Sequence, residues 1–416
     1  MEKKITVQWR QPSGEVFSTI FAGDLCPREQ NGPSVAARAA DIISEVKPLF
    51  KAADFRMLQW ECAIAPDARP IVKSGPNHRC CPEVLDVAVE LGTDLNLLAN
   101  NHVGDYGPEG TMSTIAACQR RGIATTGAGA NASESGKPFV KEIKGFKVAV
   151  LNSCEHEFGV ALPDTPGSCG MEPFKIWRRI KELKSTGHTV IVVLHGGHEA
   201  YPFPSPRMVE LFRFFADSGA DAVLNCHTHC PLGCEVYHGV PVVGSTGNFY
   251  FPTRRNGFEA GIWHLGYLPV ISFDAAGAFK LEITPYLNMD QGIKLLDDEA
   301  FESFEKYFGQ LNRGFSDEKF CSGMFDAWCT RSGLVSYFSV IDNSRRPESW
   351  DDPEVIRSMM PCRNLFSCES HHDLMRNSMY LVEQKRVAAA AAGFEQLETY
   401  RELKWLYEAL ARAAAR

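Results

Sequence analysis

Short apolar runs that end abruptly in polar side chains are the main pattern in the first 230 residues of the chain. The clearest run, residues 94–99, is followed directly by Asn100-Asn101-His102, and the pattern predicts that a helix begins near Pro108. Four similar runs end at Asp24, at Glu61, at His195 and at His227-Thr228-His229. Because ligands bind at the carboxyl ends of strands in open α/β sheets, we expect five strands to bring candidate ligands to one edge.

The segments between these runs have helical or hairpin patterns. Apolar residues three and four apart predict helices over 35–50, 82–91, 108–121, 172–185 and 206–218, and Lys144-Gly145 predicts a hairpin between 137–142 and 147–152. From about residue 291 onward the pattern is helical. We therefore expect an α/β domain over 1–290 and a helical C-terminal region over 291–416.

Composition and charge narrow the class of protein. The chain has 416 residues, of which 44% are hydrophobic and 23% charged, and its net charge of -8 argues against a nucleic-acid partner. We find no signal peptide and no run of about 18 apolar residues, the length that a membrane span requires. The 14 cysteines are scattered, which favours reduced thiols. A cytoplasmic protein without a membrane partner is expected.

The side chains at the strand ends are typical of a metal site. Carboxylate, amide and imidazole groups together suit Mn²⁺, Zn²⁺ or Fe²⁺ better than Ca²⁺ or Mg²⁺. Six such groups exceed what one tetrahedral zinc uses, and they suffice for two metals about 3.5–4 Å apart that share a carboxylate. The alternative is that these are ordinary turn and loop residues. The predicted ligands are Asp24, Glu61, Asn101, His195, His227 and His229.

The motifs around these positions resemble a known family. Gly23-Asp24, Ala99-Asn100-Asn101-His102, Leu194-His195-Gly196-Gly197-His198-Glu199, His227-Thr228-His229 and Gly247-Asn248-Phe249 look like the signature of CapA-type poly-γ-glutamate capsule biosynthesis proteins. These are similar to the calcineurin-like metallophosphoesterases. The resemblance covers about residues 16–252, and it implies a metallophosphoesterase-like four-layer α/β/β/α sandwich, here with a C-terminal helical appendage.

The resemblance also implies roles for single residues. The six ligands match, and His102, paired here with Asp105 as the catalytic residues, matches the histidine that protonates the leaving group in the phosphoesterases. The chain departs from the phosphoesterase pattern at Cys26, where those enzymes have a histidine, at Glu61, where they have Asp, and in the separation of Asp105 from His102. These departures favour the CapA-type branch over phosphoesterase activity.

Further residues are assigned around the ligands. Cys26 is expected as a buried thiol beside the site, with a thiolate ligand as the alternative. His198 is expected either behind the ligands or facing solvent. Glu199 falls on a family-like position, from which it could orient His195. We expect an anionic substrate to bind cationic side chains of the loop that follows Glu61. The predicted substrate-binding residues are Lys73, Arg79, Glu199 and Asn248. We interpret His371-His372 as a surface pair. Cys226, Cys230 and Cys234 do not fit a zinc finger well, because Pro231 and Gly233 lie between them and there is no second cysteine pair.

Two classes of function fit this sequence. The first is a metal-dependent hydrolase, in which a hydroxide bridging two metals (Mn, Zn or Fe) attacks a phosphoester or an amide such as a γ-glutamyl bond. Its substrate would be a small or peptide-like anion. The second is a non-catalytic or scaffold role in the biosynthesis of a poly-γ-glutamate-type polymer. In either case the C-terminal helices could join copies of the chain into a homo-oligomer.

Overall fold

The computed structural model describes residues 3–28, 32–252, 260–342 and 353–415. Its central strands carry apolar side chains on both faces. In β10 (Phe146–Cys154), Val148 and Val150 join one buried cluster, whereas Ala149 and Leu151 join another. Since successive side chains of a strand point to opposite faces, this strand is covered on both sides.

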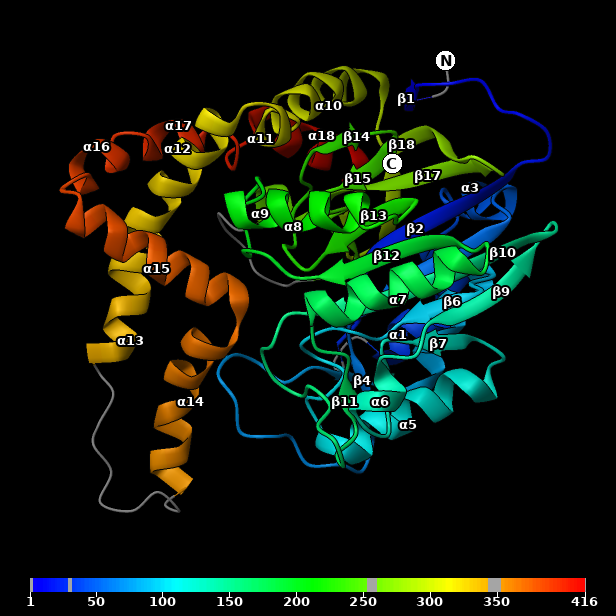
Figure 1. Ribbon diagram of the computed structural model, residues 1–416, viewed down its shortest axis with the longest axis horizontal. Helices are drawn as coiled ribbons and strands as arrows, with labels where there is room; N and C mark the ends of the chain where they lie inside the picture. Colours follow the sequence, from blue (N-terminus) through cyan, green and yellow to red (C-terminus); the bar gives the residue numbers. More distant parts are fainter. Residues whose placement is uncertain (1–2, 29–31, 253–259, 343–352, 416) are drawn as a thin grey trace.

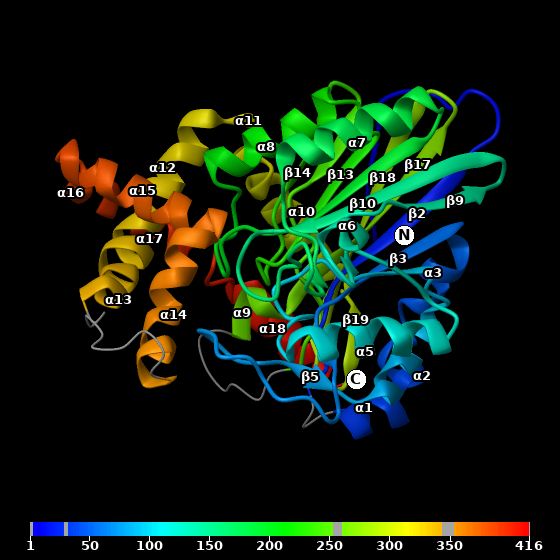
Figure 2. The same ribbon diagram turned by 60° about the horizontal axis from the view of Figure 1, so that its bottom comes forward.

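The strand β2 (Phe17–Leu25) shows the same division. Phe17 lies in the cluster that also holds Val148, whereas Ile20 lies in a cluster with the side chains of short helices. The shared cluster therefore lies between two sheets, and the other two clusters lie under outer helices. This is the predicted metallophosphoesterase-like α/β/β/α sandwich, and Figure 2 shows α7 and α8 on one side of the strands and α1, α2 and α5 on the other.

The larger sheet has the strand order β1-β18-β17-β2-β3-β6-β7, with β16 beside β2 and β19 beside β18. Strands β2, β3, β6 and β7 are parallel, so their carboxyl ends lie at one edge. Besides β2, its strands are β1 (Ile5–Gln8), β3 (Phe55–Trp60), β6 (Leu95–Leu97), β7 (Ala124–Thr126), β16 (Asn248–Tyr250), β17 (Leu265–Asp274), β18 (Gly277–Met289) and β19 (Gly292–Leu295).

The smaller sheet has the order β14-β15-β13-β12-β10-β9, in which β10, β12 and β13 are parallel. The predicted hairpin is confirmed as the antiparallel pair β9 and β10. Besides β10, its strands are β9 (Phe139–Ile143), β12 (Thr189–His195), β13 (Ala222–Cys226), β14 (Cys234–Tyr237) and β15 (Val240–Val243). Two separate two-stranded pairs are formed by β4 (Ala63–Ile64) with β5 (Arg79–Cys80), and by β8 (Ala128–Gly129) with β11 (Gly167–Ser168).

The helices of the sandwich bury one apolar stripe each. In α8 (Pro206–Asp217), Met208, Phe212 and Phe215 are buried at helical spacing, as the sequence pattern predicts. The other helices of this part are α1 (Gly32–Ala37), α2 (Ala39–Ile42), α3 (Lys47–Ala52), η2 (Pro82–Leu85), α4 (Asp86–Leu91), α5 (Gly107–Arg120), α6 (Ala132–Ser135), α7 (Pro173–Ser185) and α9 (Ala260–Trp263).

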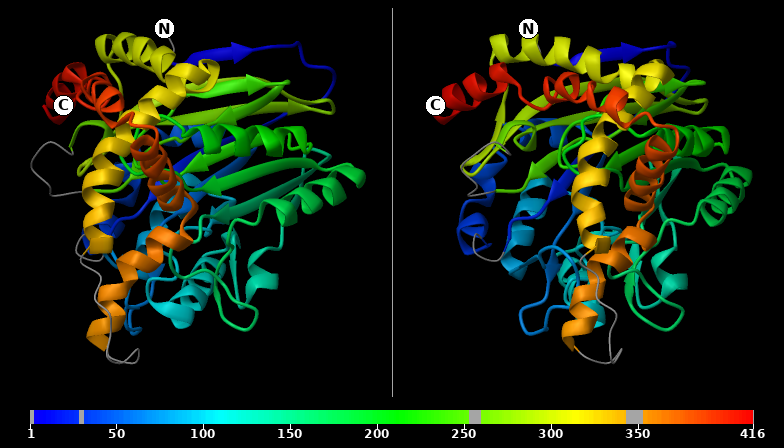
Figure 3. Two further views of the ribbon diagram at one scale, coloured as in Figure 1. Left: turned by 60° about the vertical axis from the view of Figure 1, so that its left-hand side comes forward. Right: turned by 90° about the vertical axis from the view of Figure 1, so that its left-hand side faces the viewer.

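The described residues from 298 onward are mainly helical, and most of these helices gather on one side of the sandwich (Figures 1 and 3). The predicted division after residue 290 falls between the paired strands β18 and β19, and the division into two domains stays a prediction. The elements are α10 (Asp298–Leu311), α11 (Arg313–Ser316), α12 (Glu318–Trp328), the π-helix η3 (Cys329–Tyr337), α13 (Phe338–Asp342), α14 (Pro353–Ser367), α15 (Glu369–Glu383), α16 (Val387–Ala391), α17 (Phe394–Glu398) and α18 (Lys404–Ala414).

The core between the sheets continues into the C-terminal helices. The ring of Phe304 stacks on Phe308 at a centroid distance of 5.4 Å, and Phe308 meets the ring of Tyr267 in β17 edge-on at 5.2 Å. All three side chains belong to the cluster that lies between the sheets. The C-terminal helices therefore complete the sandwich core at one end.

A buried ionic cluster attaches α15 to the loop after β10. Arg207 Nη2 donates to Glu155 Oε1 at 2.6 Å and to Ser370 Oγ at 2.7 Å, and Arg207 Nε lies 3.4 Å from Asp373 Oδ2. Burial raises the pKa of Glu155, but the attraction of Arg207 and the hydrogen bond from Ser370 outweigh burial and lower this pKa to about 2. We call these four residues the α15 clamp.

In the part of the chain that the structure describes, none of the helices combines the length and apolar character that a membrane span requires.

Phe304→Ala tests the continuity of the core. Phe304 is fully buried, so its removal should lower the free energy of unfolding by about 3–5 kcal/mol, and thermal unfolding should remain one transition. Phe366→Ala in α14 is the control, since this side chain is 72% exposed and its loss should change stability little. A separate early transition in Phe304→Ala would show that the helical region unfolds as a domain of its own.

The α15 clamp predicts a loss of stability that depends on pH. Arg207→Met leaves Glu155 buried without its cation and Asp373 with Arg376 alone, which should cost about 3–5 kcal/mol at pH 7. The folded-state pKa of Glu155 is depressed, so its contribution is complete above the ordinary glutamate pKa of about 4.3 and is lost as pH falls toward 2. Urea unfolding at several pH values should therefore show the two proteins converging at low pH. Arg213→Met, which breaks the less buried pair with Glu235, is the control, and an equal loss there would contradict the prediction.

Candidate metal centre

The six predicted ligands come from both sheets and meet between them. Asp24 lies near the end of β2, and Glu61 directly follows β3. His195 ends β12, and the remaining ligands lie on the turns after β6 and β13. All six are buried: Asp24 and Glu61 are 0% exposed, His195 1%, His227 3%, and Asn101 and His229 5%. The structure thus brings together all six side chains.

Four of these side chains surround one point. His195 Nε2 lies 3.0 Å from Asn101 Oδ1, 3.1 Å from His227 Nδ1 and 3.4 Å from Glu61 Oε1. Ligand atoms about 2.0–2.1 Å from a tetrahedral zinc are separated by about 3.3 Å. These three distances from His195 Nε2 suit a four-coordinate site with two nitrogen and two oxygen ligands.

A second group contains Asp24, Glu61 and His229, whose ligand atoms lie within 4.8 Å of one another. His229 Nδ1 lies 2.9 Å from Asn248 Oδ1, so this ring can donate Nδ1–H to the amide and present Nε2 to the site. Three protein ligands leave room for an exchangeable ligand. Glu61 belongs to both groups and is the side chain able to bridge them.

The donor set fits a pair of divalent cations. Among the described residues, no donor makes a hydrogen bond to either oxygen of Glu61. Burial raises the pKa of Glu61 to about 8, and burial followed by the repulsion of Glu61 raises that of Asp24 to about 6. Asp24 accepts a hydrogen bond from the backbone N–H of His227, but Glu61 accepts none from the described residues. Two such buried carboxylates would be strongly unfavourable without a cation, and bound divalent cations would offset that penalty.

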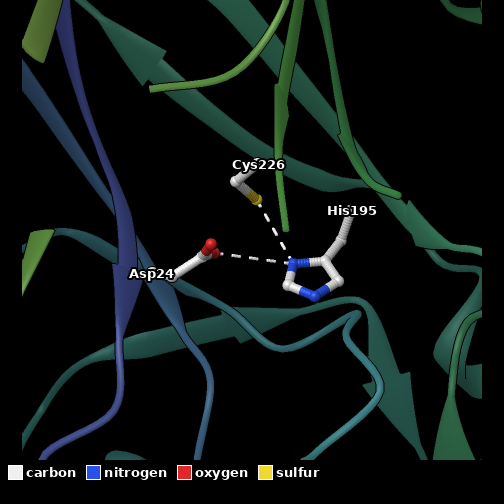
Figure 4. Close-up of side chains that lie close together, drawn as sticks. All are labelled: Asp24, His195 and Cys226. Carbon is white, nitrogen blue, oxygen red and sulfur yellow. Dashed lines mark hydrogen bonds and ion pairs between the residues drawn. The ribbon is translucent and has the colours of Figure 1, made fainter. Parts of the chain in front are cut away.

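The backbone and one thiol orient the histidines. His195 Nδ1 lies 3.3 Å from Cys226 Sγ and 3.6 Å from Asp24 Oδ1, so Nε2 is the nitrogen that faces the first group (Figure 4). His227 and His229 have φ angles of 96° and 55°, a left-handed conformation that is strained for residues other than glycine. The turn after β13 therefore aims both imidazoles into the site.

His102 stands beside the ligands with its own partners. Its Nδ1 lies 2.7 Å from Asp105 Oδ2, and Lys73 pairs with the other oxygen of Asp105. Burial and the charge of Lys73 hold the pKa of His102 well below its usual range, so the ring is neutral. With Nδ1–H donated to Asp105, the free nitrogen of His102 is Nε2. Although Asp105 is three residues away in sequence, the turn brings the two side chains into contact.

A cavity of about 320 Å³ adjoins the first group through Asn101. Lys73, Asn101 and His102 line it from one side, and Glu199 and His198 line it from another. The C-terminal helices supply the remaining wall, with Trp328, Ser332, Ser336, Tyr337, Asn364, His371 and Leu374. The cavity is large enough for a small molecule or the end of a chain.

Of the residues predicted around the ligands, three do not line this cavity. Arg79 lies over the ring of Tyr106 and donates to the carbonyls of Ala65 and Pro66, so the structure does not bring it to the substrate side. Asn248 is fully buried behind His229 and orients that ligand. Cys26 is buried, and burial raises the pKa of its thiol while Cys62 lowers it through a hydrogen bond.

The sequence analysis missed Glu157. Its Oε1 lies 3.4 Å from His227 Nε2, and its Oε2 accepts from Asn101 Nδ2 at 3.4 Å. The signal was present, because Glu155 and Glu157 directly follow the apolar strand β10 and so repeat the pattern of the other ligands. The contribution of the C-terminal helices had no comparable signal in the sequence.

Comparisons with known proteins identify the family of this chain. The model of the family described as "Bacterial capsule synthesis protein PGA_cap" matches residues 18–253. The PGA biosynthesis protein CapA of Bacillus subtilis (strain 168) is 27% identical over 289 residues, which cover 66% of this chain and 72% of that protein. The capsule biosynthesis protein CapA of Bacillus anthracis is 30% identical over 219 residues, 50% of this chain, and the match spans only 53% of that relative.

One solved structure shows the extent of the structural likeness. A 5'-nucleotidase precursor from Thermus thermophilus superposes with a TM-score of 0.43 at 13% identity, over 73% of this chain and 60% of that chain. The family model includes every candidate metal ligand from Asp24 to His229 and more than half of the 416 residues, so the chain belongs to the PGA_cap family of bacterial capsule synthesis proteins.

Proposed function

We propose that this protein is a dinuclear metal-dependent hydrolase that cleaves a phosphoester or an amide, including a γ-glutamyl bond. The observation that carries this proposal is Glu61, a fully buried carboxylate without hydrogen bonds among the described residues that belongs to two adjacent groups of ligand atoms. A metal serving only stability would need neither a second group nor an adjoining cavity. Mn²⁺, Zn²⁺ and Fe²⁺ suit the nitrogen and oxygen ligands.

The side chains of the site have separate roles in this proposal. Bound divalent metals would supply a nucleophile at neutral pH and polarise the bond to be cleaved. Asn101, His195 and His227 would hold one metal and Asp24 and His229 the other, with Glu61 available to both. His102 would take up a proton at its free Nε2 from the attacking water and pass it to the leaving group, while Asp105 accepts from Nδ1–H and fixes the ring.

The cavity supports an anionic substrate of limited size. Lys73 has its ammonium beside His102, and its side chain is only 3% exposed, so this cation faces the cavity rather than bulk solvent. A volume of about 320 Å³ fits a small molecule or the end of a polymer. The relatives named CapA act in capsule or PGA biosynthesis by their names, and a γ-glutamyl chain end is a substrate of this chemical type.

The alternative is a non-catalytic or scaffold role in the assembly of a poly-γ-glutamate-type polymer. The names of the relatives favour it, since they describe synthesis and not cleavage. A cytoplasmic location and association through the C-terminal helices are compatible with both functions. The two are separated by whether the protein turns over phosphoesters or γ-glutamyl amides once it is loaded with metal.

Metal content tests the dinuclear centre. Protein reconstituted with Mn²⁺ should hold about two metals per chain by elemental analysis. Glu61→Gln removes the shared charge and should reduce the content to one metal or fewer. Glu199→Gln is the control, because this residue lines the cavity without belonging to either group of ligands. Well under one metal per chain in the unaltered protein would refute the centre.

Substitutions at two adjacent residues separate binding from proton transfer. Asn101→Ala removes a ligand, so metal content and turnover should fall together. His102→Ala should leave metal content unchanged and lower the rate by about 10²–10⁴, because only proton transfer is lost. The loss should be smaller for aryl phosphates or anilides whose leaving groups need no proton.

The measurement is turnover of both variants on good and poor leaving groups, with metal stoichiometry determined in parallel. If His102→Ala loses metal, or loses the same factor in rate on both kinds of leaving group, His102 is a ligand or a structural residue and not the proton donor.

A further inference from the structure

The C-terminal helices bring a second kind of ligand to the edge of the metal centre. A carboxylate oxygen of Glu157, the sulfur of Cys368 and a ring nitrogen of His371 lie within 4.8 Å of one another. Glu157 comes from the loop after β10, whereas Cys368 and His371 lie at the start of α15. Cys368 and His371 lie outside residues 18–253, the part that the family model matches. The sequence pattern suggested only a surface pair at His371-His372.

The position of this group is fixed by its surroundings. The α15 clamp holds the first turn of α15 against Glu155, two residues before Glu157, and Ser370 donates to Glu155 from both its backbone N–H and its hydroxyl. Cys368 is fully buried, and its sulfur donates to Glu155 Oε2 at 3.5 Å. The three ligand atoms are therefore held by buried contacts between two parts of the chain and not by a mobile surface.

Two polar atoms beside the group have no partner. Among the described residues, neither His371 Nδ1 nor Asn364 Oδ1 makes a hydrogen bond, although both atoms are buried. Asn364 is 6% exposed, and it lines the same cavity as Glu157 and His371. Buried polar groups are nearly always paired, so this pair of unpaired atoms indicates a bound group that satisfies them.

We propose that Glu157, Cys368 and His371 form a third metal position, separate from the two that share Glu61. Thiolate, imidazole and carboxylate are the ligands of a zinc-type site, and the thiolate selects Zn²⁺ or Co²⁺ over Mn²⁺. Three protein ligands leave a fourth position open toward the cavity. On binding, Cys368 loses its proton to solvent and its sulfur bonds to the metal.

The charges around the group balance such an ion. Carboxylate oxygens of Glu155 and Glu369 lie within 4.8 Å of the sulfur of Cys368, and Arg207 neutralises Glu155. The guanidinium of Arg363 lies over the ring of Phe158 at 4.7 Å, and it interacts with Cys368 and Glu157. A thiolate and Glu157 then carry two negative charges, which match one divalent cation. The group adjoins the first two positions through Glu157, which contacts His227.

Cobalt provides a direct test. A thiolate bound to Co²⁺ gives a sulfur-to-metal charge-transfer absorption, which nitrogen and oxygen ligands do not give. We expect the full-length protein to bind about three Co²⁺ or Zn²⁺ per chain and to show this band. Cys368→Ser should abolish the band and reduce the content by one metal, with the other two retained. Cys226→Ser is the control, because Cys226 is another buried thiol close to metal-ligand side chains. This variant should keep the band.

A second pair of variants guards against misfolding of Cys368→Ser. His371→Ala should also lose one metal and weaken the band, whereas His372→Ala, the exposed neighbour on the same helix, should lose neither. A band that survives in Cys368→Ser, or a metal content that is unchanged in His371→Ala, overturns the third position. These outcomes do not depend on hydrolysis. Failure of the dinuclear centre would appear separately, as loss of Mn²⁺ binding.

Discussion

The burial of the Glu61 carboxyl group without a hydrogen bond is the constraint on which the site depends. This group lies fully buried between the sheets and has no hydrogen-bond donor among the described residues, so its ionised form is strongly disfavoured unless a cation binds. The surrounding side chains either lie close to this carboxyl group or orient a side chain that does. Asp24 and the histidines approach it directly, whereas Cys226 and Asn248 orient the imidazoles. The two sheets are thus joined at this edge by electrostatics as well as by packing.

Most of the sandwich and its ligands could be predicted from the sequence because the signal is local. An apolar strand such as β12 ends at His195, and the carboxyl ends of parallel strands meet at one edge whatever the details of packing. The helices of the sandwich follow from apolar spacing of three and four residues. The pairing of His102 with Asp105 depends on the tight turn before α5, and strand patterns do not encode such a turn.

The wall of the cavity could not be predicted for a related reason. Residues such as Trp328 and His371 reach the site through packing between elements more than 100 residues apart in the chain. Helical periodicity identifies their helices, but it carries no information about what those helices cover. Arg79 shows the converse, since a loop cation near a ligand in sequence pairs with carbonyl groups away from the site. Long-range ionic contacts, such as that of Arg207 with Glu155, decide which helices and side chains reach the cavity.

The attachment of α15 has a consequence for synthesis on the ribosome. The last ligand of the sandwich, His229, leaves the ribosome well before Ser370, which closes the α15 clamp. At about 5–20 residues per second, the nascent chain carries an open metal edge and an incomplete apolar core for on the order of ten seconds. During that interval metal ions can enter from solvent without passing the C-terminal helices. Loading during translation would therefore be easier than loading of the finished protein, and the helices would then retain what has been bound.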